Sequence, residues 1–449
     1  MNFELTKDFI DDLNALIKQE QADKILRLLE EIHLADIADI VEEIELKNAS
    51  YIFSLLEEET AAEVLIHLEE DTKEHLLKTF TSKEIAEDLI ENMDSDDAAD
   101  VISTLSDEKK EEVLLHIEDI NQASDIVDLL SYPEDSAGGL MAKELIHVNQ
   151  NWSVLRCVRE MRRQAEDIEN VYTIYVVSDD NILLGTLSLK RLLLTPEKTF
   201  ISEVYNQKVI SVKATESNEE VANIMEKYDL IVLPVIDDLG RLIGRITIDD
   251  VVDVIKEEAE KDYQMASGIS ENIESSDSIF TITRARLPWL LIGLTGGIMG
   301  AKVMGNFELH EHIELTYFTP LIAAMGGNVG VQSAAIIVQG LAGGSLGLES
   351  VGSRLLKEMG VALINGIICS IIIYVSCMAM GYEQAVCLTV GLSLIAVIIF
   401  AALFGTFVPL SLNKYKIDPA LATGPFITTV NDILGLFIYF YIGKVLLGY

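Results

Sequence analysis

Hydrophobic residues follow three different patterns along the chain. From residue 1 to about 130, apolar positions recur at spacings of three and four with almost no Gly or Pro, which predicts short amphipathic helices. From about 143 to 262, β-branched runs bounded by Asp, Asn and Gly predict strands and turns. Beyond residue 284, long uncharged stretches predict five membrane-spanning helices, at about 287–305, 315–341, 359–382, 384–412 and 419–443.

The first segment contains an internal period of 24 residues. Ala38, Ala62 and Ala86 open similar stretches, and a second set of helices lies between them, starting near Tyr51 and His75. Two short helices per unit, stacked on the next pair, bury faces that one unit cannot bury alone. We therefore expect an α-helical superhelix over residues 1–130. The alternative is a series of ordinary amphipathic helices whose spacing is accidental.

The middle segment, residues 131–262, contains one pattern twice. The stretch from Val176 to Leu189, with Gly185 in its second apolar run, matches the stretch from Val235 to Ile248 with Gly244, 59 residues later. Each copy predicts a strand, a turn, a second strand and a helix. The two copies resemble tandem cystathionine-β-synthase (CBS) modules, and GRITIDDVVDVI is a specific instance of that module's ending. The resemblance implies α+β modules at about 143–200 and 207–262.

An acidic helix is predicted to connect the second module to the apolar part. Apolar residues at Val252, Ile255 and Ala259 have helical spacing, and acidic side chains fill the positions between them. We assign 251–283 to this connecting region and 284–449 to a transmembrane domain.

The distribution of charged residues also changes near residue 284, where the long apolar stretches begin. The first 283 residues hold 65 acidic and 25 basic side chains, so they carry the whole net charge of -40. This excess opposes binding to a phosphate backbone, and nucleic acid is not expected as a partner. Residues 1–11 lack a basic start followed by an apolar stretch, so we expect no secretory signal and a cytoplasmic N-terminus.

Basic residues at the ends of the predicted spans indicate the topology. Flanking Lys and Arg favour the cytoplasmic side of a membrane. With five spans, this predicts a multi-pass protein with its N-terminus inside and its C-terminus outside. Six basic residues lie on the side continuous with the soluble part, against Lys302 and Lys444 on the other: Arg284, Arg286, Arg354, Lys357, Lys414 and Lys416.

One ionisable residue, Asp432, stands inside the last predicted span. A carboxylate near the bilayer centre costs roughly 2.5–3.5 kcal/mol, so it should face water, an ion or a partner. No Lys or Arg lies in the central part of any span to pair with it. Thr428 shares its helical face, and Pro425 predicts a partly broken helix that lines a wet path. A cation is the natural counter-charge, unless the carboxyl is simply protonated.

The second predicted span adds amide groups. Asn328, Gln332 and Gln339 fall on one face, and Gly326, Gly327 and Gly330 allow close backbone approach. Amides, hydroxyls and a carboxylate are oxygen ligands that suit a hard cation, whereas zinc and copper prefer nitrogen or sulfur. Mg²⁺ dehydrates reluctantly, and one Asp from each of two subunits would hold it hydrated. Mn²⁺ and Co²⁺ accept the same ligands, and simple helix packing is an alternative explanation for the second span.

The whole chain resembles the MgtE family of magnesium channels and transporters. The resemblance rests on the acidic helical segment, the paired CBS modules, the connecting helix and four motifs in this order: YPEDSAGGLM at Tyr132, RLPWLLIGLTGG at Arg286, PLIAAMGGNVGVQS at Pro320 and DPALATGPFITTVND at Asp418. It implies a homodimer in a bacterial-type cytoplasmic membrane, with the pore on the two-fold axis. It also implies that Asp432 contacts the ion in the pore, and that the soluble part senses intracellular Mg²⁺.

The excess of carboxylates suggests how the soluble part gates the pore. Bringing acidic faces together costs repulsion, which bound divalent ions relieve. Our hypothesis is that high internal Mg²⁺ clamps the helical segment against the CBS modules, and that the connecting helix then closes the inner mouth near Asp418. Taken singly, each of these acids is equally consistent with a solvated surface charge. The proposed regulatory residues are Glu58, Glu59, Asp94, Asp96, Asp97 and Asp100 of the helical segment, and Asp249, Asp250, Asp253, Glu257 and Glu258 of the connecting helix.

Three further expectations complete the interpretation. CBS modules commonly bind adenine nucleotides, so ATP is a candidate cofactor at the cleft between the two copies, although no Gly-rich phosphate loop is present. An ion-coupled transporter, in which Asp432 exchanges protons or sodium for the divalent ion, is the alternative to a channel. An enzyme is not expected, because no set of nucleophile, base and orienting residue is evident.

Overall fold

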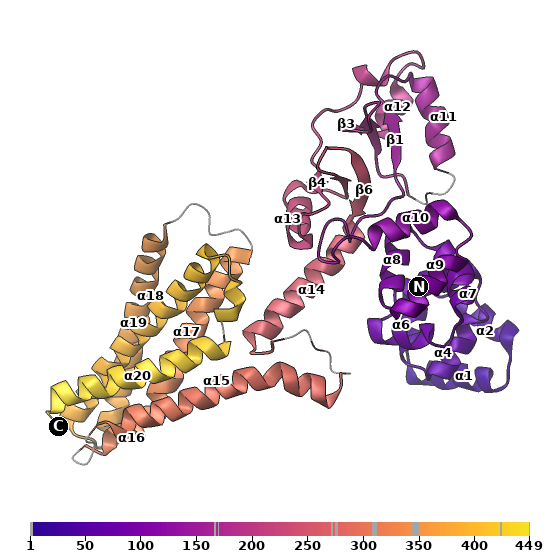
Figure 1. The fold of residues 1–449 in the computed structure, drawn as a ribbon. Helices are drawn as coiled ribbons and strands as arrows, with labels where there is room; N and C mark the ends of the chain where they lie inside the picture. Colours follow the sequence, from indigo (N-terminus) through magenta and orange to yellow (C-terminus); the bar gives the residue numbers. More distant parts are fainter. Residues whose placement is uncertain are drawn as a thin grey trace. The chain divides into compact units, whose positions relative to one another are not determined.

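The computed structural model describes residues 3–165, 168, 170–270, 273, 277–307, 312–342, 350–422 and 424–448. The chain forms two compact units, Met1–Ile255 and Lys256–Tyr449. Figure 1 traces the first unit from indigo to pink and the second from pink to yellow. The first unit contains a helical part and a part with two small sheets, and the second is formed by long helices.

Short helices form the N-terminal part of the first unit. They share one continuous apolar core with the second of the two sheets, to which Leu13, Ile90, Val235 and Val254 all belong. The helical elements are α1 (Lys7–Lys18), α2 (Ala22–Leu29), α3 (Leu34–Glu42), α4 (Leu46–Phe53), α5 (Glu58–Ile66), α6 (Glu70–Leu77), α7 (Ser82–Glu84), the π-helical turn η1 (Ile85–Leu89), the 3-10 turn η2 (Ile90–Asn92), α8 (Ser95–Ser103), α9 (Asp107–His116) and α10 (Ile120–Leu129).

The 24-residue period of the sequence is present in these helices. Helices α3, α5 and α7 begin at Leu34, Glu58 and Ser82, which are 24 residues apart. The alanines at the equivalent positions, Ala38, Ala62 and Ala86, are each at most 2% exposed. These buried positions, where a helix of one repeat packs on a helix of the next repeat, are occupied by a small side chain each time. The 24-residue period therefore reflects a repeated packing contact. The predicted stack of helix pairs is confirmed.

Two small sheets follow, one for each copy of the repeated pattern. In each, the outer strands flank a central strand that pairs parallel on one side and antiparallel on the other, in the orders β1-β2-β3 and β4-β5-β6. This confirms the α+β modules. The elements are β1 (Ile146–Asn149), α11 (Val154–Gln164), β2 (Ile174–Val177), β3 (Leu183–Leu187), α12 (Leu189–Leu194), the 3-10 turn η3 (Ile201–Glu203), β4 (Val212–Lys213), α13 (Asn218–Tyr228), β5 (Val232–Ile236) and β6 (Leu242–Thr247).

The glycine common to both copies lies within the second strand of each hairpin. Gly185 pairs with Val176, and Gly244 pairs with Val235. At Gly244 an added Cβ would lie 2.6 Å from the sulfur of Met141, and at Gly185 it would overlap the backbone of Asn206. Glycine is therefore required because another segment crosses the strand closely.

Helix α14 (Ile248–Ala266) begins directly after β6 and runs for 19 residues. Its first turn carries Asp249 and Asp250, and the side chains of Val251 and Val254 are buried. The predicted connecting helix is therefore present, starting three residues earlier than the assigned region. It ends before Gly268, whose positive φ of 82° breaks the helix.

The second unit consists of long apolar helices. Five of the described helices are long and apolar enough to cross a membrane, and α19 is the most buried of them because it packs against α17, α18 and α20 (Figure 1). The elements are α15 (Ile279–Gly305), α16 (Glu314–Tyr317), α17 (Thr319–Ala342), α18 (Val351–Ala379), α19 (Gln384–Lys414), the 3-10 turn η4 (Pro419–Ala422) and α20 (Gly424–Leu447).

Capping residues explain why two spans start earlier than predicted. Helices α15 and α18 begin at Ile279 and Val351, about eight residues before the apolar stretches that mark them in the sequence. The side chains of Ser278 and Ser350 accept hydrogen bonds from backbone amides three residues on, which fixes the two starts.

The prediction of a broken helix at Pro425 is wrong. Helix α20 begins at Gly424, so Pro425 lies in its first turn, where no backbone hydrogen bond to a preceding residue is needed. The break instead precedes the helix, at the turn η4. Backbones also approach closely inside the unit, since a Cβ at Gly405 of α19 would overlap the carbonyl oxygen of Gly330 of α17.

Candidate functional site

Carboxylates gather where the helical part meets the sheets of the first unit. Asp94 and Asp96 lie at the start of α8, Glu144 precedes β1, and oxygen atoms of the three side chains lie within 4.8 Å of one another. Asp97 and Asp250 interact electrostatically with the same group. We call these five residues the acidic cluster.

Hydrogen bonds between the two parts hold the cluster together. The carboxylate of Glu144 accepts from the backbone N–H of Ser95 at 3.2 Å and from its hydroxyl at 2.8 Å. The Ser95 hydroxyl oxygen in turn accepts from the backbone N–H of Lys143 at 2.9 Å. Glu144 therefore caps α8 from a distant segment, which favours a negative charge at this helix start. Asp250 accepts from the hydroxyl of Thr247 at 2.6 Å in the first turn of α14.

Burial and crowding make three of these carboxyl groups, Asp96, Asp97 and Asp250, hard to ionise. Burial, followed by the charge of Asp250 and then of Asp100, raises the pKa of Asp97 to about 7. Burial and the neighbouring Asp97 and Asp250 raise the pKa of Asp96 well above its ordinary value. The pKa of Asp250 is also raised, chiefly by burial. A group of carboxylates that repel one another in a partly buried place favours either protons or a cation.

The cluster differs from the set expected from the sequence. Asp94, Asp96, Asp97 and Asp250 lie together. Glu58 and Glu59 are exposed in the first turn of α5, whereas Glu63, one helical turn further on, is the residue of that helix whose charge acts on Asp97. Glu144 and Glu63 were missed. Helical spacing from the alanines of α5 points to Glu63, but only the fold brings Glu144 to α8.

Other expected acids lie at the border of this cluster. Asp100 is exposed one turn along α8, and its charge raises the pKa of Asp97. Asp249 and Asp253 are exposed neighbours of Asp250 on α14 and contribute to its raised pKa. These three residues therefore add negative charge around the cluster.

The second unit contains the other end of α14 and the remaining acids. Glu258 accepts a hydrogen bond from Lys261 at 3.1 Å, and Glu257 is exposed. The pKa of Lys261 is raised by this hydrogen bond and also by the charges of Asp418 and Asp262. Asp418 also accepts from the backbone N–H of Ala420 at 2.8 Å, at the start of η4. A lysine thus stands among the acids that were expected to hold a metal ion near the inner mouth.

Asp432 lies on α20 where this helix faces glycines of α17. A Cβ at Gly327 would lie 3.7 Å from Oδ1 of Asp432 and 3.1 Å from the Thr428 methyl group. Thr428 donates its hydroxyl to the carbonyl of Gly424 at 3.0 Å, which leaves its oxygen lone pairs for other partners. The adjacent Asn431 is 1% exposed and donates to the carbonyl of Gly326 at 3.3 Å. Asn431 thereby fixes α20 against α17 and sets the position of Asp432.

The amides of α17 do not share the buried face of the glycines. Gly326, Gly327 and Gly330 are buried against α19 and α20, whereas Asn328, Gln332 and Gln339 are exposed on the single chain. The three amides are thus exposed together, and the glycines allow the close approach of neighbouring helices that the sequence indicated. The glycines serve helix packing, and the amides form a separate polar stripe.

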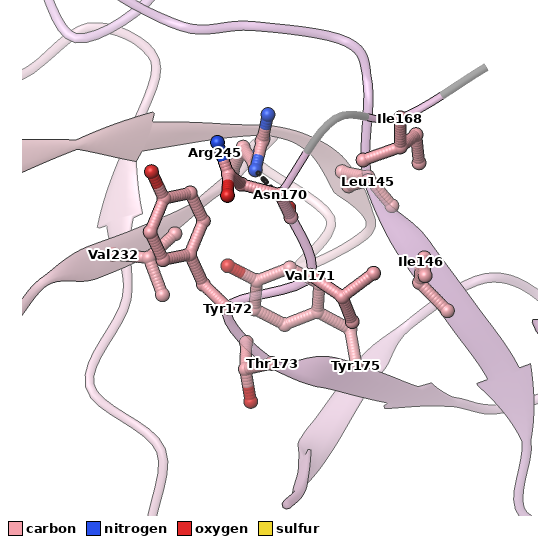
Figure 2. Close-up of a pocket in the computed structure, with 10 residues that line it drawn as sticks. All are labelled: Leu145, Ile146, Ile168, Asn170, Val171, Tyr172, Thr173, Tyr175, Val232 and Arg245. Carbon is pink, nitrogen blue, oxygen red and sulfur yellow. Dashed lines mark hydrogen bonds between the residues drawn. The ribbon is translucent and has the colours of Figure 1, made fainter. Parts of the chain in front are cut away.

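A small cavity lies between the two copies of the repeated pattern. It is lined by residues from the first copy, such as Tyr172 and Tyr175, and by Val232 and Arg245 of the second (Figure 2). Its volume of about 10 Å³ leaves room for roughly one water molecule. The hydroxyl of Tyr175 and Nε of Arg245 are buried without a hydrogen-bond partner among the described residues.

Family models match all three parts of the chain. Residues 319–442 match the MgtE model, described as a divalent cation transporter, residues 32–135 match the MgtE intracellular N domain, and residues 137–196 and 201–257 match the CBS domain. The magnesium transporter MgtE of Thermus thermophilus is 36% identical over 328 residues, covering 72% of this chain and 73% of the relative. The chain belongs to the MgtE family. MgtE of Bacillus subtilis is 32% identical over 70% of each chain.

Solved structures of the family agree with the first unit. The cytosolic domain of the Mg²⁺ channel MgtE, in complex with ATP, is 34% identical with a TM-score of 0.51, over 55% of this chain and 99% of that one. The soluble part of a magnesium transporter is 27% identical with a TM-score of 0.50, over 56% of this chain and 99% of that one. The MgtE fold expected for the soluble part, with helical domain and paired CBS modules, is thereby confirmed.

The raised pKa of Asp97 predicts a pH-dependent stability. An acid whose pKa rises on folding destabilises the folded state as pH increases from its unfolded value, near 3.8, to its folded value, near 7. In EDTA, Asp97→Asn should therefore leave the free energy of unfolding of residues 1–262 unchanged below pH 4. It should raise this free energy by roughly 2–4 kcal/mol above pH 7. Urea denaturation followed by circular dichroism measures the difference.

Glu111→Gln, an exposed acid on α9, is the control for loss of one charge. The other charged groups around Asp97 are Asp94, Asp96, Asp100, Asp250, Glu63 and Lys73, and all of them are present in both proteins. A difference between Asp97→Asn and wild type that stays constant with pH would contradict the crowding described here.

Proposed function

We propose that this MgtE-family chain forms a homodimeric channel that carries Mg²⁺ into the cell and is closed by internal Mg²⁺. The observation that carries the proposal is the carboxylate of Asp432, held on a membrane-spanning helix beside the Thr428 hydroxyl and the glycine face of α17. The relatives named as magnesium transporters support the choice of ion. In this proposal the protein crosses the cytoplasmic membrane several times, and its C-terminus lies outside.

The exposed amides of α17 support a dimer. Polar side chains that face lipid are costly, because hydrocarbon offers no hydrogen bonds. Asn328, Gln332 and Gln339 form such a stripe on the single chain, and a second copy would cover it and line a path with amide oxygens. The mass of the purified complex, expected at twice the 49.7 kDa of one chain, checks this assembly.

The ligands favour an ion that stays hydrated. Asp432, Thr428 and Asn328 offer oxygen atoms, and Mg²⁺ keeps most of its water shell when few carboxylates are available. One carboxylate from each subunit would balance the two charges of the ion without removing its water. Mn²⁺ and Co²⁺ accept oxygen ligands too, so they are secondary substrates in this proposal.

The acidic cluster supports the closing mechanism. Its carboxylates repel one another where the helical domain meets the CBS modules, and a divalent cation bound there favours the docked arrangement. Glu63, Asp94, Asp96, Asp97, Glu144 and Asp250 supply oxygens for such ions, while Asp100, Asp249 and Asp253 add negative potential. Glu257 and Glu258 of α14, with Asp418, form the second regulatory group, closer to the membrane.

ATP is proposed as a ligand of the CBS modules. A family relative has been solved with ATP, and the cavity between the two copies is lined by Tyr175 and Arg245, whose hydroxyl and Nε have no hydrogen-bond partner in the described part of the chain. At about 10 Å³ the cavity must widen to admit a nucleotide. Equilibrium dialysis with ATP at millimolar concentration is expected to show binding, and its absence would reject this ligand.

An ion-coupled transporter remains the second candidate. In that mechanism Asp432 exchanges protons or sodium for the divalent ion, and flux depends on the gradient of the coupling ion. Mg²⁺ uptake into proteoliposomes with and without a proton or sodium gradient separates the two. The channel proposal requires equal uptake at equal membrane potential.

Replacing Asp432 tests the pore. Asp432→Asn keeps the shape of the side chain and removes its charge, so Mg²⁺ conductance should fall roughly tenfold or more. Single-channel recording in Mg²⁺ measures it. Glu383→Gln removes a carboxylate at the exposed N-cap of α19 and should leave conductance unchanged. Full conductance and selectivity in Asp432→Asn would overturn the pore assignment.

Replacing four acids of α14 tests the closing mechanism. Neutralising Asp250, Asp253, Glu257 and Glu258 to the corresponding amides should leave currents insensitive to internal Mg²⁺, because the ions that favour closure lose their ligands. Inside-out patches with stepped internal Mg²⁺ measure the response. The matched control removes four exposed acids on and before α13, Glu216, Glu219, Glu220 and Glu226. Inhibition that persists in the first variant would reject this assignment.

A further inference from the structure

Arg245 is a buried cation beside the acidic cluster. It lies in the middle of β6, is 7% exposed, and its backbone N–H and C=O both bond to Ala142, at 2.9 and 2.8 Å. Its Nη2 lies 3.6 Å from Oδ2 of Asp94. The strand belongs to the second CBS module and Asp94 to the helical domain, so this charge pair joins the two domains.

The guanidinium has few other partners. Its Nη1 donates to the carbonyl of Asn170 at 3.5 Å, a long hydrogen bond drawn in Figure 2. Its centre lies 5.5 Å from the ring of Tyr172, and its Nε has no partner among the described residues. A buried charge that makes so few hydrogen bonds is costly unless opposite charge compensates it. The carboxylates of the acidic cluster supply that opposite charge.

Two other basic side chains lie near the cluster, and neither contacts a carboxylate of the cluster across the two domains. Lys73 lies close to Asp97 and Asp100, but all three belong to the helical domain. Lys143 also joins the domains, because it donates to Asp128 of α10 at 2.6 Å and to the carbonyl of Ile243 at 3.2 Å, but its acidic partner lies outside the cluster. The pair of Arg245 with Asp94 is therefore the basic contact, among the described residues, that joins the domains at the cluster itself.

We propose that Arg245 is a built-in cation that opposes, without preventing, the separation of the helical domain from the CBS modules when no divalent ion is bound. The inference rests on the proposed function, in which the cluster binds a divalent cation. The guanidinium partly cancels the repulsion among the carboxylates, and it stays in place at all cation concentrations. It thereby sets how far the domains separate when internal Mg²⁺ is low.

The sign of the effect follows from the charges. In the docked state without a metal ion, Arg245 faces only carboxylates and is purely attractive. When a divalent cation occupies the cluster, the same guanidinium is also repelled by that cation. Losing Arg245 must therefore weaken the ion-free docked state more than the ion-bound one. Loss of a residue that served packing alone would weaken the ion-free and the ion-bound docked states equally.

Hydrogen exchange of the full-length protein in nanodiscs tests the proposal. Amide exchange in α8 reports how often the helical domain opens from the CBS modules. Arg245→Met keeps most of the side-chain volume and removes the charge. In EDTA it should speed exchange in α8 by about fivefold or more, whereas saturating Mg²⁺ should bring the rate back to that of wild type. Mass spectrometry of peptides covering Ser95–Ser103 measures both conditions.

Three comparisons keep the outcome interpretable. Arg245→Lys retains the charge and should behave nearly as wild type. Arg241→Met removes an exposed arginine paired with Asp237 at 2.7 Å, away from the cluster, and should change nothing. Equal exchange of Arg245→Met and wild type in EDTA would overturn the proposal, and so would fast exchange that Mg²⁺ fails to reverse. If Mg²⁺ leaves wild-type exchange unchanged, the cation site of the proposed function fails, while the EDTA comparison still tests Arg245.

Discussion

Repulsion between carboxylates is the constraint on which the soluble part of this protein depends. Asp94 and Asp96 at the start of α8, Glu144 before β1 and Asp250 at the start of α14 come from three distant segments, yet they meet in one partly buried place. Two helix N-termini and the hydroxyls of Ser95 and Thr247 offset part of the repulsion. Protons, Arg245 or a bound cation must offset the rest of the repulsion between the carboxylates.

The membrane part also places a negative charge in an unfavourable environment, but it contains one such carboxylate and not a group of them. Asp432 is a single carboxylate among apolar helices, and the glycines of α17 bring a second backbone close to it. Asn431, which is almost fully buried, holds α20 to the carbonyl of Gly326. Close packing of small residues and this hydrogen bond thus fix the position of one acid between α20 and α17. The cluster of the first unit groups many acids, whereas the second unit isolates one.

Hydrophobic periodicity was sufficient to predict most of the fold. The 24-residue repeat, the two strand–turn–strand copies and the five long helices all depend on local spacing, which a single sequence displays. The site was predicted less completely. Glu144 reaches α8 only through tertiary packing, and Glu63 rather than Glu59 acts on Asp97 because it lies one turn further along the same face of α5. Pro425 was misplaced because an apolar stretch does not reveal that a helix starts within it.

Helix α14 is unbroken from Ile248 to Ala266, so its 19 residues extend for about 28 Å. Its first turn belongs to the acidic cluster, and its last turn lies in the second unit, where a Cβ at Gly424 would meet the carbonyl oxygen of Ala266. A straight helix of this length converts a small rotation at one end into a larger displacement at the other. A tilt of about 10° at the carboxylate end displaces the far end by roughly 5 Å. Small adjustments among a few charged oxygens therefore become a larger displacement at the other end of the same helix.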